Sequence, residues 1–430
     1  MRTLFKGTVV HGQNGNTYKI IKLISQGTGQ GDIYKVINAR KEVFAFKLFH
    51  SGTKDFNQRL IERLMRRGQV CEAFVTPLDI VEVDDRIGYI MEYIGLEYVS
   101  AAVLCNGIEK NGIIVNLPWG LKLALLARIV ESFIILSNAN LGIIDIKFDN
   151  IKLDLNNCQI KILDTDTIIH VNDKASVRGT VSFMPPDVMT KRKAPDKDND
   201  SFAIPTIIFM SLYGSHPLDG KRRLLPCNEN IDMYLFGTHP VYVFNPTDSS
   251  NRPLPQDEFG RNQQQTIDKH KKYPDYLKKA MEAVFVDGLY DSRKRPSMSD
   301  WLDILERLYN DSFVCENCGE EHFLDTKDKI CGVCKQELLK PIFIQSDKAV
   351  PLFNGMTIYS DDIWATTAHY EVFKVVPTKY DGRMGLQLMI LDRANLKLAG
   401  GDVKTFVNGE AIPIFLDSEI EIESHNIKFI

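Results

Sequence analysis

A single stretch, Leu141 to Asp166, places the strongest constraint on how this chain folds. It reads LGIIDIKFDNIKLDLNNCQIKILDTD. Two β-type runs within it, Ile151–Leu155 and Gln159–Leu163, are separated by the turn signal Asn156-Asn157. Pairing of these runs brings the residues before the first strand close to those after the second. The stretch therefore predicts a small polar cluster at the open end of a hairpin.

Four residues of this cluster suit metal-assisted phosphoryl transfer. Asp145 can accept or orient a hydroxyl proton, and Lys147 can neutralise the charge that develops on a phosphate. The amide oxygen of Asn150 and the carboxylate of Asp164 are hard ligands that suit Mg²⁺. The alternative interpretation is a polar hairpin on the protein surface, because short motifs also occur by chance.

Composition bounds the class of protein. A chain of 430 residues accommodates two or three domains, and 44% hydrophobic and 25% charged residues are typical of a soluble globular protein. The net charge of -4 gives no support to nucleic-acid binding. The apolar stretches are too short or too interrupted to cross a bilayer, and the N-terminus lacks the apolar core of a signal peptide. We therefore expect a cytoplasmic protein without membrane or nucleic-acid partners.

Residues 1–95 are expected to form strands with one helix. The β-type runs Tyr18–Ile24 and Ile33–Asn38 flank three glycines, Gly27, Gly29 and Gly31. A glycine-rich hairpin lets backbone N–H groups approach a polyphosphate without obstruction by side chains. A plain tight hairpin is the alternative interpretation.

One lysine, Lys47, interrupts the apolar strand Val43–Phe49. Burial of a lysine without an anion is costly, so we interpret Lys47 as a phosphate-binding residue that needs a carboxylate partner. The alternative is a lysine on an edge strand. Phe56–Arg67 reads as an amphipathic helix, and Glu62 near its centre is the candidate partner.

Two further strands and a series of helices follow. The strands Leu78–Val83 and Ile87–Tyr93 are joined by a turn, and the second ends in Met91, Glu92 and Tyr93. From residue 96 to residue 310 the pattern is mainly helical, apart from the hairpin. The expected helices are Leu121–Asn138, Ser201–Tyr213, Tyr276–Val284 and Met298–Tyr309.

In their order and spacing, these features make residues 1 to about 310 resemble a eukaryotic-like protein kinase domain. The landmarks are Gly27, Gly29, Gly31, Lys47, Glu62, Met91, Glu92, Tyr93, Asp145, Lys147, Asn150 and Asp164. The resemblance implies an α+β, bilobal protein-kinase-like fold, with an N-lobe at 1–95 and a C-lobe at 96–310. It also implies ATP and Mg²⁺ as cofactors and a protein substrate.

The resemblance assigns a role to each landmark. The three glycines would cover the phosphates, Lys47 held by Glu62 would orient them, and Met91, Glu92 and Tyr93 would form the hinge that binds adenine. Asp145 would position the substrate hydroxyl, Lys147 would stabilise the transferred phosphate, and Asn150 and Asp164 would hold the metal ions. Asp200 would anchor the catalytic loop, and Arg295 would pair with Asp187.

Three departures from the kinase pattern matter. Ile143-Ile144 precedes Asp145 where the family has His-Arg, so we expect activity that does not depend on an activation-loop phosphate. Asp164-Thr165-Asp166 replaces Asp-Phe-Gly, which removes a flexible glycine and adds a carboxylate near the metals. Pro185-Pro186-Asp187 replaces Ala-Pro-Glu. A pseudokinase is therefore the alternative to an active enzyme.

The departures resemble one bacterial branch of these kinases, which carries the Asp-Thr-Asp motif and the phrase Gly29-Gln30-Gly31-Asp-Ile-Tyr34. Kinases of this branch accompany a PP2C-type phosphatase and a von Willebrand A-domain protein in systems labelled tellurite-resistance-like. The resemblance therefore implies those two partners. Ser176, Thr180 and Ser182 are possible autophosphorylation sites in the loop that follows the hairpin.

Two Cys-x-x-Cys pairs indicate a metal site at residues 311–340. Cys315 and Cys318 precede Cys331 and Cys334 by a spacer of 12 residues, which is the pattern of a Cys₄ zinc ribbon. Gly319 and Gly332 would permit the two knuckle turns, and four sulfur ligands indicate a structural Zn²⁺. A redox dithiol or disulfides are the alternatives. We expect the nearby His322 to lie on the surface.

Residues 341–430 are expected to form an all-β sandwich. Seven short runs alternate apolar and polar residues: Ala349–Tyr359, His369–Val376, Gly385–Leu391, Val403–Val407, Ile412–Phe415, Ile420–Ile422 and Ile427–Ile430. The stretch around Phe406 to Ile412 resembles the last strands of forkhead-associated (FHA) domains. The Arg and Ser-x-x-His that read phosphothreonine in true FHA domains are missing, so we expect an FHA-like domain that contacts proteins. A plain structural cap is the alternative.

Two functions follow from these features. The first is a protein serine/threonine kinase, a phosphotransferase that uses ATP and Mg²⁺. The alternative is a pseudokinase scaffold that docks partners through the zinc ribbon and the β domain. The presence of Lys47, Asp145, Asn150 and Asp164 favours the first, because these are the groups that the chemistry needs.

Overall fold

The computed structural model describes most of the chain, in two compact units. The described residues are 3–26, 31–50, 54–170, 179–226, 230–255, 262–324, 326, 328–338, 343–347, 349–352, 356–380, 383–391, 393–397, 403–407, 409–414, 419–422 and 425–429. The first unit comprises Met1–Ser312 with Glu321–Thr326, and the second comprises Phe313–Glu320 with Lys327–Ile430. The expected boundaries after residues 95, 310 and 340 stay predictions.

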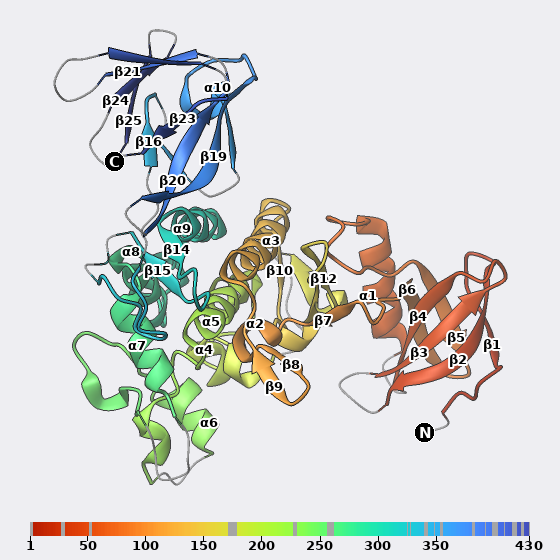
Figure 1. The fold of residues 1–430 in the computed structure, drawn as a ribbon. Coiled ribbons are helices and arrows are strands. Elements are labelled where there is room, and N and C mark those ends of the chain that lie inside the picture. Colours follow the sequence, from red (N-terminus) through yellow and green to blue (C-terminus); the bar gives the residue numbers. More distant parts are fainter. Residues whose placement is uncertain are drawn as a thin grey trace. The chain divides into compact units, whose positions relative to one another are not determined.

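The first unit begins with an antiparallel sheet of six strands in the order β1-β2-β3-β4-β6-β5 (Figure 1). The strands are β1 (Val9–His11), β2 (Thr17–Ser25), β3 (Gly31–Asn38), β4 (Val43–Phe49), β5 (Asp79–Val83) and β6 (Arg86–Glu92). Strand β4 lies between β3 and β6, so Lys47 is on an interior strand. The alternative interpretation of Lys47 as an edge-strand lysine is therefore wrong.

Helix α1 (Lys54–Arg67) packs on this sheet through the apolar face that the sequence predicts. Ile61 is fully buried and shares a hydrophobic cluster with Ala45, Tyr89 and Met91 of the sheet. The helix begins two residues before the expected start. Glu62 on its polar face is partly exposed, whereas Asn57 is buried.

Helices are the principal regular elements in the remainder of the first unit (Figure 1). They are α2 (Val103–Asn106), α3 (Trp119–Asn138), α4 (Pro186–Met189), α5 (Asp200–Tyr213), α6 (Ile231–Met233), α7 (Gln264–Lys272), α8 (Asp275–Glu282) and α9 (Met298–Asn310). Helix α5 is apolar around its whole circumference and is buried accordingly, with α3 and α7 among its neighbours. No helix in the described part of the chain is both long and apolar enough to span a membrane.

The predicted hairpin lies in this helical part. Strand β11 (Ile151–Asp154) pairs with β12 (Gln159–Ile162), and its other edge pairs with β7 (Tyr98–Ser100). The carboxylate of Asp154 accepts hydrogen bonds from the backbone N–H groups of Asn156 and Asn157, which forms the turn. A second pair, β10 (Leu141–Ile143) with β13 (Ile168–His170), brackets the residues at the open end of the hairpin. A small hairpin, β8 (Ile108–Lys110) and β9 (Ile113–Val115), stands apart from these sheets.

A tight turn follows β12 and fixes the polar end of the hairpin. Asp164 adopts a left-handed conformation, with φ 54° and ψ 41°, and Thr165–Thr167 form one 3₁₀ turn. The fully buried Thr165 donates its hydroxyl hydrogen to the Val75 carbonyl at 2.6 Å. This bond ties the turn to the segment between α1 and β5.

The second unit contains two described sheets around one hydrophobic core. One sheet has the order β17-β16-β25-β24-β21-β22 and the other the order β18-β19-β20-β23. The strands are β16 (Phe343–Gln345), β17 (Ala349–Pro351), β18 (Thr357–Tyr359), β19 (Glu371–Tyr380), β20 (Arg383–Ile390), β21 (Arg393–Lys397), β22 (Val403–Val407), β23 (Ala411–Pro413), β24 (Glu419–Ile422) and β25 (His425–Phe429). Ile344 and Ile427 from the first sheet share the core with Phe373 and Leu388 from the second.

The strands of the second unit differ from the expected seven. The run Ala349–Tyr359 divides into β17 and β18. Strands β16 and β21 are not among the expected runs. A four-residue helix, α10 (Ser360–Ile363), follows β18. Two short strands, β14 (Ser312–Val314) and β15 (Glu321–Phe323), precede these sheets along the chain.

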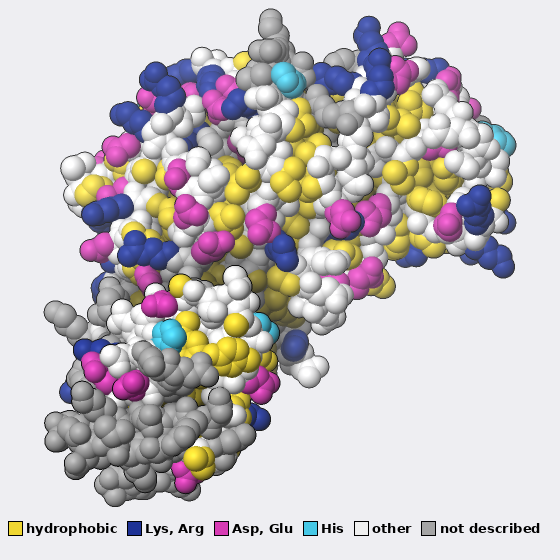
Figure 2. Space-filling view, turned by 90° about the horizontal axis from the view of Figure 1, so that it is seen from above, with side chains coloured by type: hydrophobic (Ala, Val, Ile, Leu, Met, Phe, Trp, Pro, Cys, Tyr) yellow, Lys and Arg dark blue, Asp and Glu magenta, His cyan; other side chains and the backbone are white. Residues whose placement is uncertain are grey.

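The surface is mixed in charge. Basic and acidic side chains are interspersed on the face seen in Figure 2, as the net charge of -4 suggests.

The Thr165 hydrogen bond gives a test of how the turn is held. Thr165→Val keeps the side-chain shape but leaves the buried Val75 carbonyl without the hydroxyl, so we expect a loss of about 1–3 kcal/mol of unfolding free energy. Thr206→Val is the matched control. Thr206 is also fully buried and donates to the Phe202 carbonyl, which lies four residues earlier in α5 and also accepts an intrahelical bond. Urea unfolding should show a smaller loss for the control; equal losses would contradict the assigned role.

Candidate active site

Lys47 is the buried centre of the site. Its residue is 5% exposed, and its Nζ lies 3.1 Å from Asp164 Oδ1 and 2.7 Å from Asp166 Oδ2. The side chain of Asp164 is 35% exposed, whereas that of Asp166 is only 1% exposed. Two carboxylates of different accessibility therefore neutralise one buried ammonium group.

Burial and charge act in opposite directions on this cluster. Burial alone would lower the pKa of Lys47, but the Tyr89 phenol and the two aspartates outweigh it and raise the pKa well above the ordinary value. Burial raises the pKa of Asp166, Lys47 opposes that effect, and Asp164 adds to it. The ion pair opposes the effect of burial on both partners, because each charge favours the charged form of the other.

Glu62 does not contact Lys47, in contrast to the expectation from the sequence. Among the described residues, the ion-pair partners of Lys47 are Asp164 and Asp166, and Glu62 Oε1 instead accepts a hydrogen bond from Gln58 Nε2 at 2.9 Å. The left-handed conformation of Asp164 is the local reason, because the turn it starts places both aspartates beside the lysine. The expected ion pair between α1 and β4 is therefore replaced by ion pairs between the turn after β12 and β4.

The loop before β11 brings four polar groups together. Lys147 Nζ lies 3.3 Å from Asp145 Oδ2, and Asn150 Nδ2 donates to the Asp145 carbonyl at 2.9 Å. The Thr180 hydroxyl donates to Asp145 Oδ1 at 2.6 Å. From the sequence, Thr180 was expected only as a possible autophosphorylation site. The one feature of the sequence that could have indicated its contact with Asp145 is its position directly after Gly179.

Gly179 allows Thr180 to reach Asp145. It has φ +93°, and a Cβ at this position would lie 2.6 Å from the Ile144 carbonyl oxygen. Both observations favour glycine, because a side chain would strain the backbone and collide with the residue that precedes Asp145. The close approach of the two segments therefore depends on this residue.

Asn150 and Asp164 offer the hard oxygen ligands that Mg²⁺ prefers. Asn150 is 7% exposed, and its backbone carbonyl accepts the N–H of Leu163, the residue before Asp164. The strand register, Ile151 opposite Ile162, thus brings the two residues to the same end of the hairpin. With its Nδ2 bonded to the Asp145 carbonyl, Asn150 has its amide oxygen as the side-chain acceptor. These residues fit a divalent cation.

The expected hinge residues lie at the end of β6. Met91 is 8% exposed and packs in the cluster between the sheet and α1. Glu92 pairs with Lys161 of β12 at 2.8 Å, and Lys35 Nζ lies 4.2 Å from the centroid of the Tyr93 ring. These side chains are engaged by the protein, which is compatible with adenine recognition through the backbone.

Of the three glycines expected to form a phosphate-binding loop, Gly31 is among the described residues. Gly27 and Gly29 lie outside the described residues, as does Ser176. Gly31 begins β3 opposite Phe49, and a Cβ there would lie 2.4 Å from the Leu48 carbonyl oxygen. In the described structure, Gly31 therefore allows close approach of β3 and β4.

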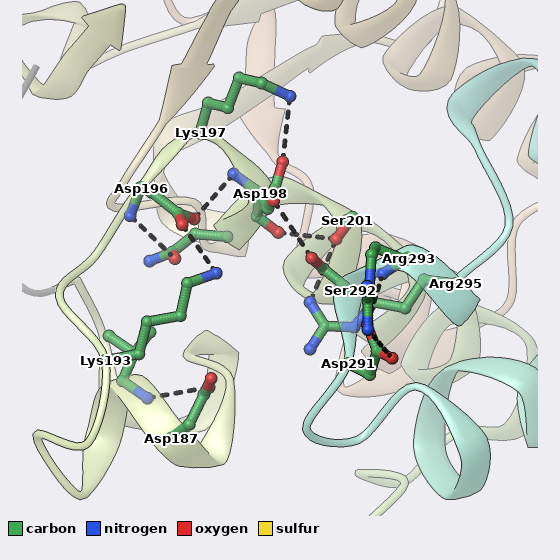
Figure 3. Close-up of polar contacts among 12 residues, drawn as sticks. Asp187, Lys193, Asp196, Lys197, Asp198, Ser201, Asp291, Ser292, Arg293 and Arg295 are labelled. Atoms are coloured by element: carbon green, nitrogen blue, oxygen red, sulfur yellow. Dashed lines mark hydrogen bonds and ion pairs between the residues drawn. The ribbon is translucent and has the colours of Figure 1, made fainter. Parts of the chain in front are cut away.

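Arg295 and Asp187 do not form the expected ion pair (Figure 3). The Arg295 guanidinium donates to the Gly288 carbonyl at 2.7 Å, and it also bonds the Ser201 hydroxyl. Burial lowers the pKa of Arg295, and the charge of Asp187 only partly opposes that effect. Both residues line a cavity of about 330 Å³.

Asp200 is the first residue of α5 and is 7% exposed. Burial, followed by the neighbouring Asp198, raises the pKa of Asp200 to about 8. A hydrogen bond that its carboxyl group accepts from the Ser201 backbone N–H opposes this shift.

The four cysteines of the two knuckles gather in the second unit. Their Sγ atoms all lie within 4.8 Å of one another. The Sγ–Sγ distances are 3.6 Å for Cys315–Cys334 and 3.7 Å for Cys318–Cys331. A tetrahedral Zn²⁺ with Zn–S bonds of about 2.3 Å requires separations of about 3.8 Å, so the cluster fits this ion.

The knuckle turns correct two expectations from the sequence. The left-handed residue after each second cysteine is Gly319 in the first knuckle (φ 71°) but Lys335 in the second (φ 63°), so Gly332 is not the residue that permits the turn. His322 was expected on the surface, but it is 6% exposed within β15. Among the described residues, the group of side chains placed to hold a metal ion consists of the four cysteines and does not include His322.

No family model matches the sequence. No curated protein matches it either. Among solved structures, the chain is similar to the autoinhibited serine kinase domain of the giant muscle protein titin, with 15% sequence identity and a TM-score of 0.49. That match covers 67% of this chain and 81% of the titin kinase chain.

Gly179→Ala tests the close approach that brings Thr180 to Asp145. We expect a loss of more than about 2 kcal/mol of unfolding free energy, because a left-handed backbone costs about 1–2 kcal/mol and the collision with Ile144 adds to it. Gly112→Ala is the matched control, since Gly112 has φ +78° and nothing within 4 Å of its Cβ position. Chemical denaturation that gave equal losses for the two variants would contradict the collision.

The cysteine cluster predicts bound zinc. Elemental analysis of the purified protein should find about one zinc per chain, and Cys318→Ser should reduce that content severalfold, because a structural site needs all four thiolates. Cys71→Ser is the control, since Cys71 is a free cysteine outside the cluster. A wild-type protein without zinc, or a Cys318 variant with full zinc content, would show that the cluster is not a zinc site.

Proposed function

We propose that the chain is a protein serine/threonine kinase that uses ATP and Mg²⁺ and has a bilobal protein-kinase-like fold. The hydrogen bond from the Thr180 hydroxyl to Asp145 at 2.6 Å carries this proposal. It supports a carboxylate that orients an aliphatic hydroxyl, which is what transfer to a serine or threonine needs. The position of Lys147 beside the same carboxylate supports a site for a phosphate next to that hydroxyl.

Each residue then has a defined task. Asp145 orients the acceptor hydroxyl and takes its proton, and Lys147 stabilises the charge on the transferred group. Lys47 orients the phosphates once their oxygens replace one of its aspartate partners, and Asn150 and Asp164 would hold Mg²⁺. The metal ion supplies neutralisation of the phosphate charge. Positioning and electrostatic stabilisation account for catalysis.

Activity is proposed to be independent of an activation-loop phosphate. The residues before Asp145 are Ile143 and Ile144, which are 1% and 4% exposed and pack as apolar residues. No arginine at this place can clamp a phosphate. Resemblance to the bacterial branch supports a PP2C-type phosphatase and a von Willebrand A-domain protein as partners.

A pseudokinase scaffold is the second candidate. The observation that favours it is the pairing of Lys47 with two aspartates instead of Glu62, since one of these ion pairs must open before the lysine can meet a phosphate. In that case the zinc ribbon and an FHA-like β domain would dock partners. The two sheets around one core in the second unit support a β-sandwich for this role.

Phosphoryl transfer separates the two candidates. Wild type is incubated with Mg²⁺ and γ-labelled ATP, alone and with a generic acceptor protein, beside Asp145→Asn and Lys47→Ala. We expect transfer by wild type and a reduction of about 10²–10⁴-fold in kcat for Asp145→Asn, the usual range for loss of a general base. Asp149→Asn is the matched control, because Asp149 is an exposed carboxylate in the same loop. Absence of transfer by wild type would favour the scaffold.

A further inference from the structure

A buried ammonium group needs a carboxylate that stays with it throughout the working cycle. Lys47 is 5% exposed on an interior strand, and a buried charge that loses its partner is strongly destabilising. If Lys47 is to bind phosphates, at least one of its contacts must remain to hold the side chain in place. The identity of that permanent partner therefore matters for both stability and catalysis.

Asp164 is poorly suited to be the permanent partner. Its side chain is 35% exposed, and its contact with Lys47, at 3.1 Å, is the longer of the two. It is also the residue that would hold Mg²⁺ together with Asn150. A carboxylate that ligates a metal ion is less available to a neighbouring ammonium group.

Glu62 is engaged elsewhere. Its Oε1 accepts a hydrogen bond from Gln58 of the same helix at 2.9 Å, and its side chain is partly exposed. A partly exposed glutamate is still hydrated, so it gains little free energy from forming an ion pair. The helix therefore does not supply the counter-charge for Lys47 in this structure.

Asp166 has the properties of a permanent partner. Its side chain is 1% exposed, its Oδ2 lies 2.7 Å from Lys47 Nζ, and its Oδ1 is buried without a hydrogen-bond partner in the described part of the chain. The turn that carries it is tied down by the bond from Thr165 to the Val75 carbonyl. A buried carboxylate in a fixed turn has Lys47 as its available counter-ion.

We propose that Asp166, in place of Glu62, is the positioning residue that holds Lys47 in the orientation used for phosphate binding. This inference rests on the proposed function and deepens it. The carboxylate that follows the metal ligand by two residues replaces the helix carboxylate. The orientation of Lys47 then depends on the hairpin turn that carries Asp166.

Enzyme kinetics with two isosteric neutral variants tests this role. Asp166→Asn should raise the KM for ATP at least about tenfold and lower kcat/KM by about 100-fold, because Lys47 loses its fixed orientation. Glu62→Gln is the matched control and should stay within about threefold of wild type in both constants. A purely structural role for Asp166 would lower kcat through the fraction of folded enzyme and leave KM unchanged. That result, or equal effects of the two variants, would overturn the proposal.

A double-mutant cycle tests the pair without relying on catalysis. Urea unfolding is measured for Lys47→Met, Asp166→Asn and the double variant, and the same cycle is run with Glu62→Gln. We expect a coupling of at least tenfold in the folding equilibrium constant for Lys47 with Asp166, about 1.4 kcal/mol, and none for Lys47 with Glu62. Coupling to Glu62 without coupling to Asp166 would overturn the proposal. Absence of phosphoryl transfer by wild type would instead reject the kinase function. The double-mutant cycle would still show whether Asp166 is the partner that stabilises Lys47.

Discussion

The buried charge of Lys47 is the interaction on which the rest of the site depends. An ammonium group on an interior strand is stable only beside carboxylates, and the two it uses come from a turn 117 and 119 residues later in the chain. This pair joins the sheet to the hairpin of the helical part. The same ion pairs hold the proposed phosphate-binding lysine next to the proposed metal ligands. They therefore contribute both to the stability of the fold and to the arrangement of the proposed site.

The hairpin is the element that concentrates the chemistry. Its register brings Asn150 and Asp164 to one end, and the adjoining loop adds Asp145 and Lys147. Gly179 then lets the following segment approach closely enough for Thr180 to donate to Asp145. Short-range contacts between neighbouring backbone segments thus assemble a set of groups that can orient a hydroxyl, neutralise phosphate charge and hold a cation.

The second unit is organised on different principles. Its β sheets share a core of aliphatic and aromatic side chains, whereas the cysteine knuckles depend on four sulfur atoms held at the separations that a tetrahedral ion requires. Small metal-bound modules gain their stability from ligation because they bury little apolar surface. The two parts of this unit therefore depend on different groups, four thiol groups in the knuckles and apolar core side chains in the sheets.

The sequence by itself determined the features that depend on local pattern. These are the hairpin, the buried helices α3 and α5, the need of Lys47 for a counter-charge, and the grouping of the four cysteines. Only the tertiary structure decided which carboxylate meets Lys47, that Thr180 bonds Asp145, and that Arg295 misses Asp187. The physical reason is that these contacts join distant segments, and their outcome depends on details such as one backbone torsion at Asp164 and one glycine at Gly179. Such differences leave no periodic trace in a sequence, because they arise only when the segments are packed together.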